Sequence, residues 1–241
     1  ILSAGTEVSY DQICLNEAAL EPITDDSGLP EYGENGNLHT FYGEMAFDGS
    51  ANVRVAPWKA VFNASTGALV GYELGEKALV ENPLMPCLAR AVIENDLGAR
   101  QDRRLDMWRK AEMKVSSFEV VRTDSCYVVS VAFEPVAEAA QVKMRYEVYA
   151  DGKVVVTESL VDAGKLSETE MLPRFGVDFA MNGEFSTFEF FGMGPHENYS
   201  DRVSSALMGH YVQRVEDQYH YGYVRPQESG TKTQIKWMRV L

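Results

Sequence analysis

Apolar and polar residues alternate over much of the chain, which is typical of β-strands that bury one face and expose the other. The clearest example is the run from Met144 to Tyr149, in which apolar residues largely alternate with charged ones. Runs rich in β-branched and aromatic residues predict strands at 38–47, 52–62, 68–74, 118–123, 127–133, 142–150 and 154–161. Asp151-Gly152 separates the last two runs and predicts a type I′ hairpin turn. The pattern therefore predicts an antiparallel β-protein with two stacked sheets.

One helix is predicted across the edge of these sheets, over Gln101–Val115. Leu105 and Trp108 are spaced as neighbours on one helical face, and many Arg and Lys residues surround them. Residues 21–37 hold two Pro, three Gly and five acidic residues, which predicts a linker. Residues 134–141 predict a shorter loop of the same kind. The residues alone thus indicate an all-β fold with about one helix.

Composition and charge narrow the range of functions. The chain has 241 residues, of which 45% are hydrophobic, as in a folded globular protein rather than a disordered one. Its net charge of −14 repels phosphate groups, so we expect no nucleic-acid partner and no binding to an anionic membrane surface. The sequence contains no apolar run long enough to span a membrane. Neutral substrates such as sugars are compatible with this charge.

The cysteines and the chain ends bear on cellular location and completeness. Cys14, Cys87 and Cys126 cannot all pair and match no metal-binding spacing, so we expect free thiols. Free thiols suit a cytoplasmic protein, with a periplasmic one as the alternative. The chain begins without Met or a leader-like segment and ends within an apolar-alternating stretch. We therefore expect a fragment excised from a longer protein.

The most distinctive motif is Gly-Met-Gly-Pro-His-Glu-Asn-Tyr-Ser-Asp-Arg at residues 192–202, where a strand is expected to end in a turn that exposes polar groups. Its carboxylates Glu197 and Asp201 are four residues apart, and glycoside hydrolysis requires paired carboxylates. The alternative, which we favour, is that Arg202 and these carboxylates form an ion network that fixes the loop. A neighbouring Arg favours the ionised carboxylate, which is the wrong state for a general acid.

A second candidate cluster consists of Glu94, Asn95 and Asp96. Carboxylate and amide oxygens in this arrangement are suited to a cation or to sugar hydroxyls. The alternative is an Asx-turn leading into the predicted helix, in which Asn95 and Asp96 bond to backbone amides. We favour this second interpretation.

A third candidate cluster lies at residues 218–230, where Tyr219, Arg225 and Glu228 accompany further aromatic residues. Aromatic rings that stack on a sugar, with polar groups around them, are typical of a sugar-binding platform. The favoured alternative is that the tyrosines alternate along a strand and pack. No zinc-binding or phosphate-binding motif is present in the sequence.

Residues 192–202 resemble the Gly-x-Gly-Pro-x-Glu-Asn-Tyr-x-Asp-Arg signature in the C-terminal domain of β-galactosidases of glycoside hydrolase family 2. Four other stretches are similar to motifs of this family: 4–12, 62–69, 172–176 and 223–230. Residues 87–98 depart from it, because the family's Phe, Trp and Pro are missing and its first Asp is Glu94. The chain also stops before a Trp-containing stretch through which the family reaches its substrate.

The resemblance implies three parts: the tail of an immunoglobulin-like β-sandwich at 1–20, a linker at 21–37, and an incomplete C-terminal domain at 38–241. That domain is implied to be an antiparallel supersandwich of the galactose-mutarotase-like kind. The family hydrolyses terminal β-galactosides with retention, through glutamates of a (β/α)₈ barrel that precedes this region. The resemblance therefore implies no catalytic residue here, and a non-catalytic domain that supports the barrel, borders the sugar pocket and is inactive alone.

The resemblance also implies partners: the rest of a β-galactosidase, its galactoside substrate and further copies in a homo-oligomer. It implies no cofactor in this chain and leaves Mg²⁺ or Na⁺ open for the whole enzyme. The candidates for carbohydrate contact or for a structural role are Glu94, Asn95, Asp96, Glu197, Asn198, Asp201, Arg202, Tyr219, Arg225 and Glu228. Two alternatives remain, a stand-alone carbohydrate-binding module and a mutarotase-like epimerase. The epimerase requires a His (196, 210 or 220) in one cleft with Glu197 or Glu228.

Overall fold

The computed structural model describes residues 28–49, 52–168, 171–219, 222 and 228–241. The expected immunoglobulin-like tail at 1–20 lies outside these residues. Antiparallel strands dominate the described part of the chain, which confirms the predicted all-β class. The chain divides into two compact units, a larger one at Thr24–Gly183 and a smaller one that contains Glu184–Leu241.

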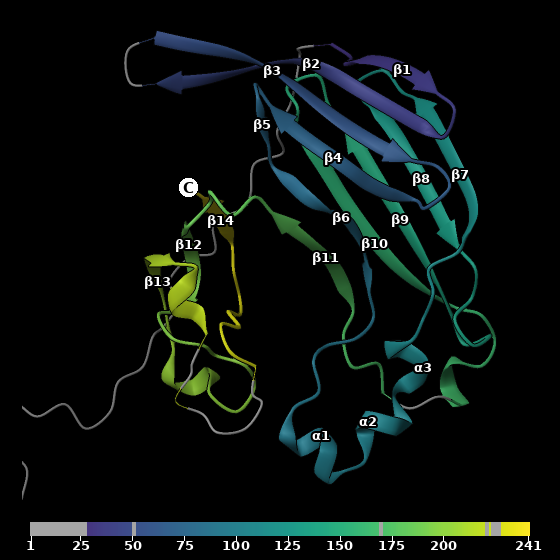
Figure 1. Cartoon of the computed structure of the whole chain (residues 1–241), viewed down its shortest axis with the longest axis vertical. Coiled ribbons are helices and arrows are strands. Elements are labelled where there is room, and N and C mark those ends of the chain that lie inside the picture. Colours follow the sequence, from purple (N-terminus) through teal and green to yellow (C-terminus); the bar gives the residue numbers. More distant parts are fainter. Residues whose placement is uncertain (1–27, 50–51, 169–170, 220–221, 223–227) are drawn as a thin grey trace, which may run out of the picture. The chain divides into compact units, whose positions relative to one another are not determined.

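The larger unit contains two antiparallel sheets, which Figure 1 shows stacked face to face. The seven-stranded sheet has the order β1-β2-β3-β4-β6-β11, with β5 paired to β4. Its strands are β1 (Glu31–Asn35), β2 (Leu38–Gly49), β3 (Asn52–Asn63), β4 (Ala68–Leu74), β5 (Lys77–Ala78), β6 (Val80–Cys87) and β11 (Gly176–Met181). The four-stranded sheet has the order β10-β9-β8-β7. Its strands are β7 (Val115–Arg122), β8 (Tyr127–Phe133), β9 (Ala140–Val148) and β10 (Val154–Asp162).

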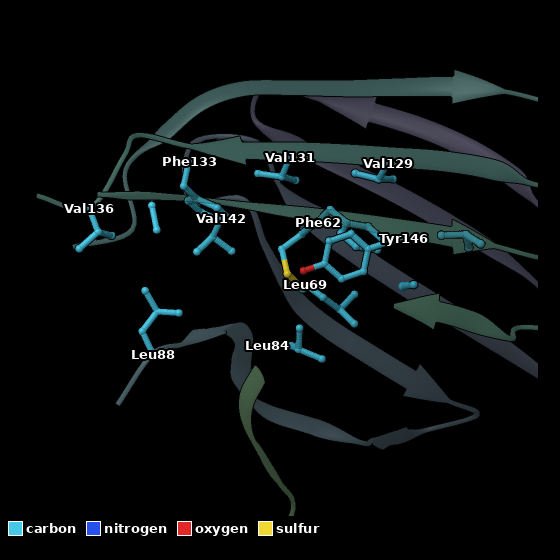
Figure 2. Close-up of a cluster of buried hydrophobic side chains, with 14 of the residues drawn as sticks. Phe62, Leu69, Leu84, Leu88, Val129, Val131, Phe133, Val136, Val142 and Tyr146 are labelled. Carbon is cyan, nitrogen blue, oxygen red and sulfur yellow. The ribbon is translucent and has the colours of Figure 1, made fainter. Parts of the chain in front are cut away.

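Alternate residues of both sheets meet in one apolar core, as the sequence pattern predicted. Along β9 the side chains of Ala140, Val142, Met144, Tyr146 and Val148 are buried, and those between them are more exposed. Figure 2 shows Tyr146 facing Phe62 of the opposite sheet, and their ring centroids are 4.9 Å apart in an edge-to-face contact. The predicted sandwich is therefore confirmed.

The β9–β10 hairpin corrects the predicted turn type. Of the two turn residues, only Gly152 has a positive φ, 85°, whereas a type I′ turn needs two. The Gly152 amide donates to the Tyr149 carbonyl, so the turn is of the type I kind followed by a left-handed glycine. Trp58 Nε1 donates to the Ala150 carbonyl at 3.0 Å and the Tyr72 hydroxyl to the Gly152 carbonyl at 2.6 Å. These bonds fasten the hairpin to the opposite sheet.

The predicted helix over Gln101–Val115 is wrong in its length and continuity. The structure has three short helices, α1 (Glu94–Gly98), α2 (Gln101–Arg104) and α3 (Asp106–Arg109), and Val115 already begins β7. Arg100 precedes α2 in a left-handed conformation with φ 58°, and Leu105 interrupts the helix between α2 and α3 with ψ 12°. Leu105 and Trp108 are both buried in the core cluster, so contacts of these side chains with distant strands hold the segment, and not one continuous helix.

The predicted linker at 21–37 also needs correction in its second half. Glu31–Asn35 forms β1 and pairs with β2 from Glu31↔Tyr42 to Asn35↔Leu38. Gly36 has φ 60° and lies in the turn between these strands. The glycines and acidic residues that suggested a linker therefore belong in part to a tight hairpin.

The smaller unit has a three-stranded antiparallel sheet of order β13-β12-β14. Its strands are β12 (Thr187–Gly194), β13 (Leu207–Arg214) and β14 (Trp237–Val240), with 3₁₀ turns at Val203–Ser205 and Glu216–Gln218. Phe190 is fully buried, with its ring centroid 5.6 Å from that of Phe188 and 5.3 Å from that of Tyr211. The helices of the described chain are all too short to traverse a bilayer. The sheet presents the signature motif at the end of β12.

Candidate functional site

The signature motif forms the last residues of β12 and the loop that leads to β13. Gly194 closes the strand, and the Gly194–Pro195 peptide bond is cis. A Cβ atom on Gly194 would lie 2.8 Å from the ring of Tyr211, so only glycine fits at this point of the chain. The loop returns through the 3₁₀ turn at Val203–Ser205 to β13.

Asn198 is the centre of this loop and is fully buried. Its Nδ2 donates to the carbonyl oxygens of Met193 (2.7 Å) and His196 (3.0 Å). Its Oδ1 accepts from the backbone amide and the hydroxyl of Thr233, at 2.6 and 2.7 Å. The whole hydrogen-bonding capacity of the side-chain amide is thus used within the protein. Asn198 therefore fixes the loop to the 231–233 segment and has no group left for a ligand.

The two carboxylates of the motif have different surroundings. Arg202 forms an ion pair with Glu197, whose side chain is only 14% exposed. This is the ion pair that the sequence favoured, and it fixes the loop from its other side. Asp201 is exposed, and the hydroxyl of its neighbour Ser200 lies 3.4 Å from it. Among the described residues, Glu197 lines the adjacent pocket and Asp201 does not.

A pocket of about 470 Å³ lies beside the loop, entirely within the smaller unit. The following residues line it, and we name it the Lys232 pocket: Thr187, Pro195, His196, Glu197, Val212, Gln213, Arg214, Asp217, Gln218 and Lys232. The signature loop, β13 and the segment before β14 each contribute to it. Its volume lies within the range of small-molecule sites in proteins.

Lys232 is a half-buried lysine of this pocket. Burial lowers its pKa, although the nearby Glu197 carboxylate opposes this effect. Lys232 Nζ donates to Gln218 Oε1 at 2.8 Å. Gln213 Nε2 donates to the Pro195 carbonyl at 2.7 Å, whereas Gln213 Oε1 is buried and has no hydrogen-bond partner. Sequence reasoning missed Lys232 and Gln213, because neither belongs to a recognisable motif.

The second candidate cluster is part of the entry to α1. Arg90 binds Asp96 through two hydrogen bonds of 2.6 and 3.0 Å, and the Ile93 amide donates to Asp96 Oδ2 at 3.0 Å. Burial alone would raise the pKa of Asp96, but the Arg90 and Ile93 hydrogen bonds outweigh it and lower that pKa. Asp96 thus has a structural role at the start of α1, but through a bond back to the Ile93 amide and not through the predicted Asx-turn. Glu94 is half-buried and Asn95 exposed in the same turn.

No three His, Cys, Asp or Glu side chains gather as metal ligands within the described residues.

The third candidate cluster is described only in part. Tyr219 is 66% exposed after β13, and Glu228 is half-buried before the segment that leads to β14. Arg225 and His220 lie outside the described residues. The structure therefore brings together neither a metal centre nor a complete aromatic platform from the described members of these clusters.

The histidines have separate environments. His196 and Glu197 line the same pocket, which is the arrangement required by the epimerase alternative. His196 Nε2 is 2.8 Å from the Ser205 hydroxyl, which in turn donates to the Arg202 carbonyl at 2.7 Å. His210 instead lies 2.6 Å from Glu189 on the sheet surface.

Comparison with known proteins gives a consistent result. The family model described as "Beta galactosidase small chain" matches residues 54–241. A β-galactosidase from Priestia megaterium is 30% identical over 240 residues, which cover 99% of this chain and 22% of that protein. A β-galactosidase from Halalkalibacterium halodurans is 28% identical over 241 residues, which cover 98% of this chain and 22% of that protein. A third, from Lactobacillus delbrueckii subsp. bulgaricus, is 32% identical over 155 residues, 63% of this chain and 15% of that protein. The chain thus spans about a fifth of the length of these relatives.

Proposed function

Because the chain belongs to the β-galactosidase small-chain family, we propose that it is a non-catalytic domain that supports the catalytic part of a β-galactosidase and borders its sugar pocket. The main support for this proposal is the share of the chain that aligns with proteins named β-galactosidase. Nearly the whole chain matches about a fifth of each of two proteins named β-galactosidase. The remaining four fifths of such a protein provide ample length for a catalytic domain.

The geometry of the acidic residues supports a structural role. Glu197 and Asp96 each form an ion pair with an Arg side chain, and the Arg90 hydrogen bonds lower the pKa of Asp96. A glycosidase needs one carboxyl group that is protonated near neutral pH and faces the glycosidic oxygen. Neither Glu197 nor Asp96 has that environment, and Asn198 is occupied by protein groups. Glu197, Asp96 and Asn198 therefore stabilise the conformation of their own loops.

The partners that follow from this proposal are the larger part of a β-galactosidase, a terminal β-galactoside bound there, and further copies in a homo-oligomer. The small-chain domain itself needs no cofactor, and Mg²⁺ or Na⁺ would belong to the larger part. We place the assembled enzyme in the cytoplasm, because Cys87 and Cys126 are free thiols.

A chimera tests the proposal. The matching 240 residues of the Priestia megaterium β-galactosidase are replaced by this chain, and release of a chromogenic phenol from a β-galactoside is measured. We expect the chimera to hydrolyse the substrate, while the isolated chain and the truncated relative do not. As a control, Lys59→Met changes a half-buried lysine that is ion-paired with Glu73 on the larger unit, and it should leave the activity of the chimera unchanged. A folded, inactive chimera together with an active isolated chain would contradict the proposal.

A second candidate function follows from His196 and Glu197 in one pocket: a mutarotase-like epimerase, with one group as acid and the other as base. The ion pair with Arg202 suits Glu197 to the role of base. Polarimetry distinguishes this candidate from the first. Faster mutarotation of α-D-galactose by the isolated chain, abolished in His196→Ala, supports the epimerase, and a rate equal to that of buffer rejects it.

A further inference from the structure

We propose that two copies of this chain associate through the free edge of β10, with the two strands antiparallel and Glu158 of each copy at the two-fold axis. The contact would join two four-stranded sheets into one sheet of eight strands. This inference concerns association between copies and does not depend on the role of the chain in a larger enzyme. It starts from the position of β10 in its sheet and from the order of its residues.

One edge of β10 has backbone groups that point away from the sheet. β10 is an end strand, and among the described strands it pairs with β9 alone. The Tyr149 amide donates to the Lys153 carbonyl and the Ala163 amide to the Ala139 carbonyl, so the odd-numbered residues of β10 are those that exchange hydrogen bonds with β9. The amide and carbonyl groups of the even-numbered residues are therefore directed outward. These residues are Val154, Val156, Glu158, Leu160 and Asp162.

The other end strands of the two large sheets have features that prevent pairing. Natural proteins protect free edges with short strands, bulges, prolines and charged side chains. β1 has five residues, two of them Glu, and β11 pairs with β6 in an irregular register. β7 has an irregular register between Val115 and Ser117 and carries Glu119 and Arg122. β10 is nine residues long, pairs with β9 without a register shift and contains no Pro, Lys or Arg.

The order of residues in β10 is complementary to itself. Residues 155–161 read Val-Val-Thr-Glu-Ser-Leu-Val, which is nearly symmetric about Glu158. When Glu158 lies on the axis, apolar side chains face apolar ones and hydroxyl groups face hydroxyl groups. Facing pairs of these kinds stabilise antiparallel sheets. The pairs are Val155–Val161, Val156–Leu160 and Thr157–Ser159.

A shift of the axis by one residue removes this match. With Thr157 on the axis, Val156 would face Glu158. With Ser159 on the axis, Glu158 would face Leu160. Either register places a carboxyl group against an apolar side chain, so the sequence of the strand selects the register that is centred on Glu158.

The dimer of the wild-type chain is expected to be weak. Val155, Val156 and Val161 are 38, 36 and 39% exposed, and the contact would bury part of this apolar surface. A contact through one strand is nevertheless small for a protein interface. Glu158 lies opposite the buried Met144 and therefore on the inner face, where the axis brings its two copies together. Facing like charges oppose pairing, so we expect a dissociation constant of about 100 µM.

The first test is sedimentation equilibrium of the whole chain at pH 8, where Glu158 is ionised because its pKa is about 7. Protein concentrations of about 10 to 500 µM span the expected dissociation constant. Glu158→Gln should lower that constant at least tenfold, because two neutral amides then meet at the axis. In the Glu158→Gln background, Val161→Lys should raise it at least tenfold, since the new charge faces Val155 of the second copy. The matched control is Val121→Lys in the same background, at a 49% exposed valine of β7, and it should associate as its parent does.

The second test determines the register. Thr157 and Ser159 of the two copies would form a non-hydrogen-bonded pair with Cα atoms about 4.5 Å apart, which suits a disulfide. A mixture of Thr157→Cys and Ser159→Cys chains should therefore form a disulfide between positions 157 and 159 under mild oxidation, identified by peptide mass spectrometry. Either variant alone is the control and should not form a disulfide within β10, because identical positions lie diagonally, about 7–8 Å apart.

Three results would overturn the proposal. They are a Glu158→Gln chain that stays monomeric over the whole concentration range, a Val161→Lys variant that associates as the Val121→Lys control does, and a disulfide between two copies of position 157. The last result would place Thr157 on the axis. Circular dichroism checks that each variant is folded. None of these results bears on the chimera experiment above, which measures hydrolysis and not association.

Discussion

Replacing Asn198 by Ala is expected to release the signature loop from the smaller unit. The side chain is fully buried and makes four hydrogen bonds, two as donor and two as acceptor. Alanine would leave the carbonyl oxygens of Met193 and His196 and both donor groups of Thr233 without these partners. Met193, His196 and Thr233 are half-buried, so water can replace a part of these bonds.

The magnitude follows from these four bonds. At about 1 kcal/mol net for each, and with some water entering the space, the loss is about 3 kcal/mol. The whole stability of a domain of this size is about 5–15 kcal/mol, so the variant should open locally long before it unfolds completely. The larger unit has its own core and should keep its stability.

Hydrogen exchange measures this opening directly. The amide of Asn198 donates to the Thr231 carbonyl at 2.9 Å, and the amide of Thr233 donates to Asn198 Oδ1 at 2.6 Å. In Asn198→Ala both should exchange about a hundredfold faster, while amides of β8 and β9 keep their wild-type rates. Ser200→Ala, an exposed change in the same loop, is the control and should cost under about 0.5 kcal/mol. Protection within threefold of wild type in Asn198→Ala would refute the reasoning.

Three further changes test other parts of the fold. Gly67→Ala should lower the free energy of unfolding by about 2–4 kcal/mol in urea titrations, because φ is 71° and the new Cβ would lie 2.6 Å from Val131; Gly75→Ala, with φ 61° and open space, should cost only about 1 kcal/mol. Arg90→Met should destabilise by about 2–3 kcal/mol at pH 7, because it leaves the buried Asp96 carboxylate unpaired. That difference should shrink as the pH falls below about 3.8, the ordinary Asp value, because Asp96 is protonated first in the variant and in the wild type only at its lowered pKa. Burial raises the pKa of Glu158 to about 7, so the wild type should lose stability as the pH rises from 4.5 through 7. Glu158→Gln should be more stable than wild type by about 1–2 kcal/mol at pH 8 and nearly equal at pH 5 in urea titrations, the value being reduced for partial exposure.

The strands could be predicted closely because their signal is local. In β4 and β8 the predicted and observed bounds coincide, and in β9 the alternation itself fixed the buried face. The helical segment could not, since its path depends on where Leu105 and Trp108 meet a core formed by distant strands. The β1 hairpin was mistaken for a linker because its glycines and acidic residues are equally typical of both.

The site shows the same division between local and distant information. The Glu197–Arg202 ion pair could be predicted because both residues belong to one short loop. The role of Asn198 could not, because its partner Thr233 is 35 residues away and carries no motif. Lys232 and Gln213 likewise meet only through the pairing of β12 with β13 and through the chain that follows. A site formed by residues that are distant in the sequence has no motif with a characteristic spacing.

The most direct test of the central claim is the incubation of the isolated chain with a chromogenic β-galactoside at neutral pH. The account predicts a rate of phenol release equal to that of buffer, because Glu197 and Asp96 are held as arginine-paired carboxylates. Turnover above buffer that disappears in Glu197→Ala, with the fold intact by circular dichroism, would contradict the account and make this chain an enzyme by itself.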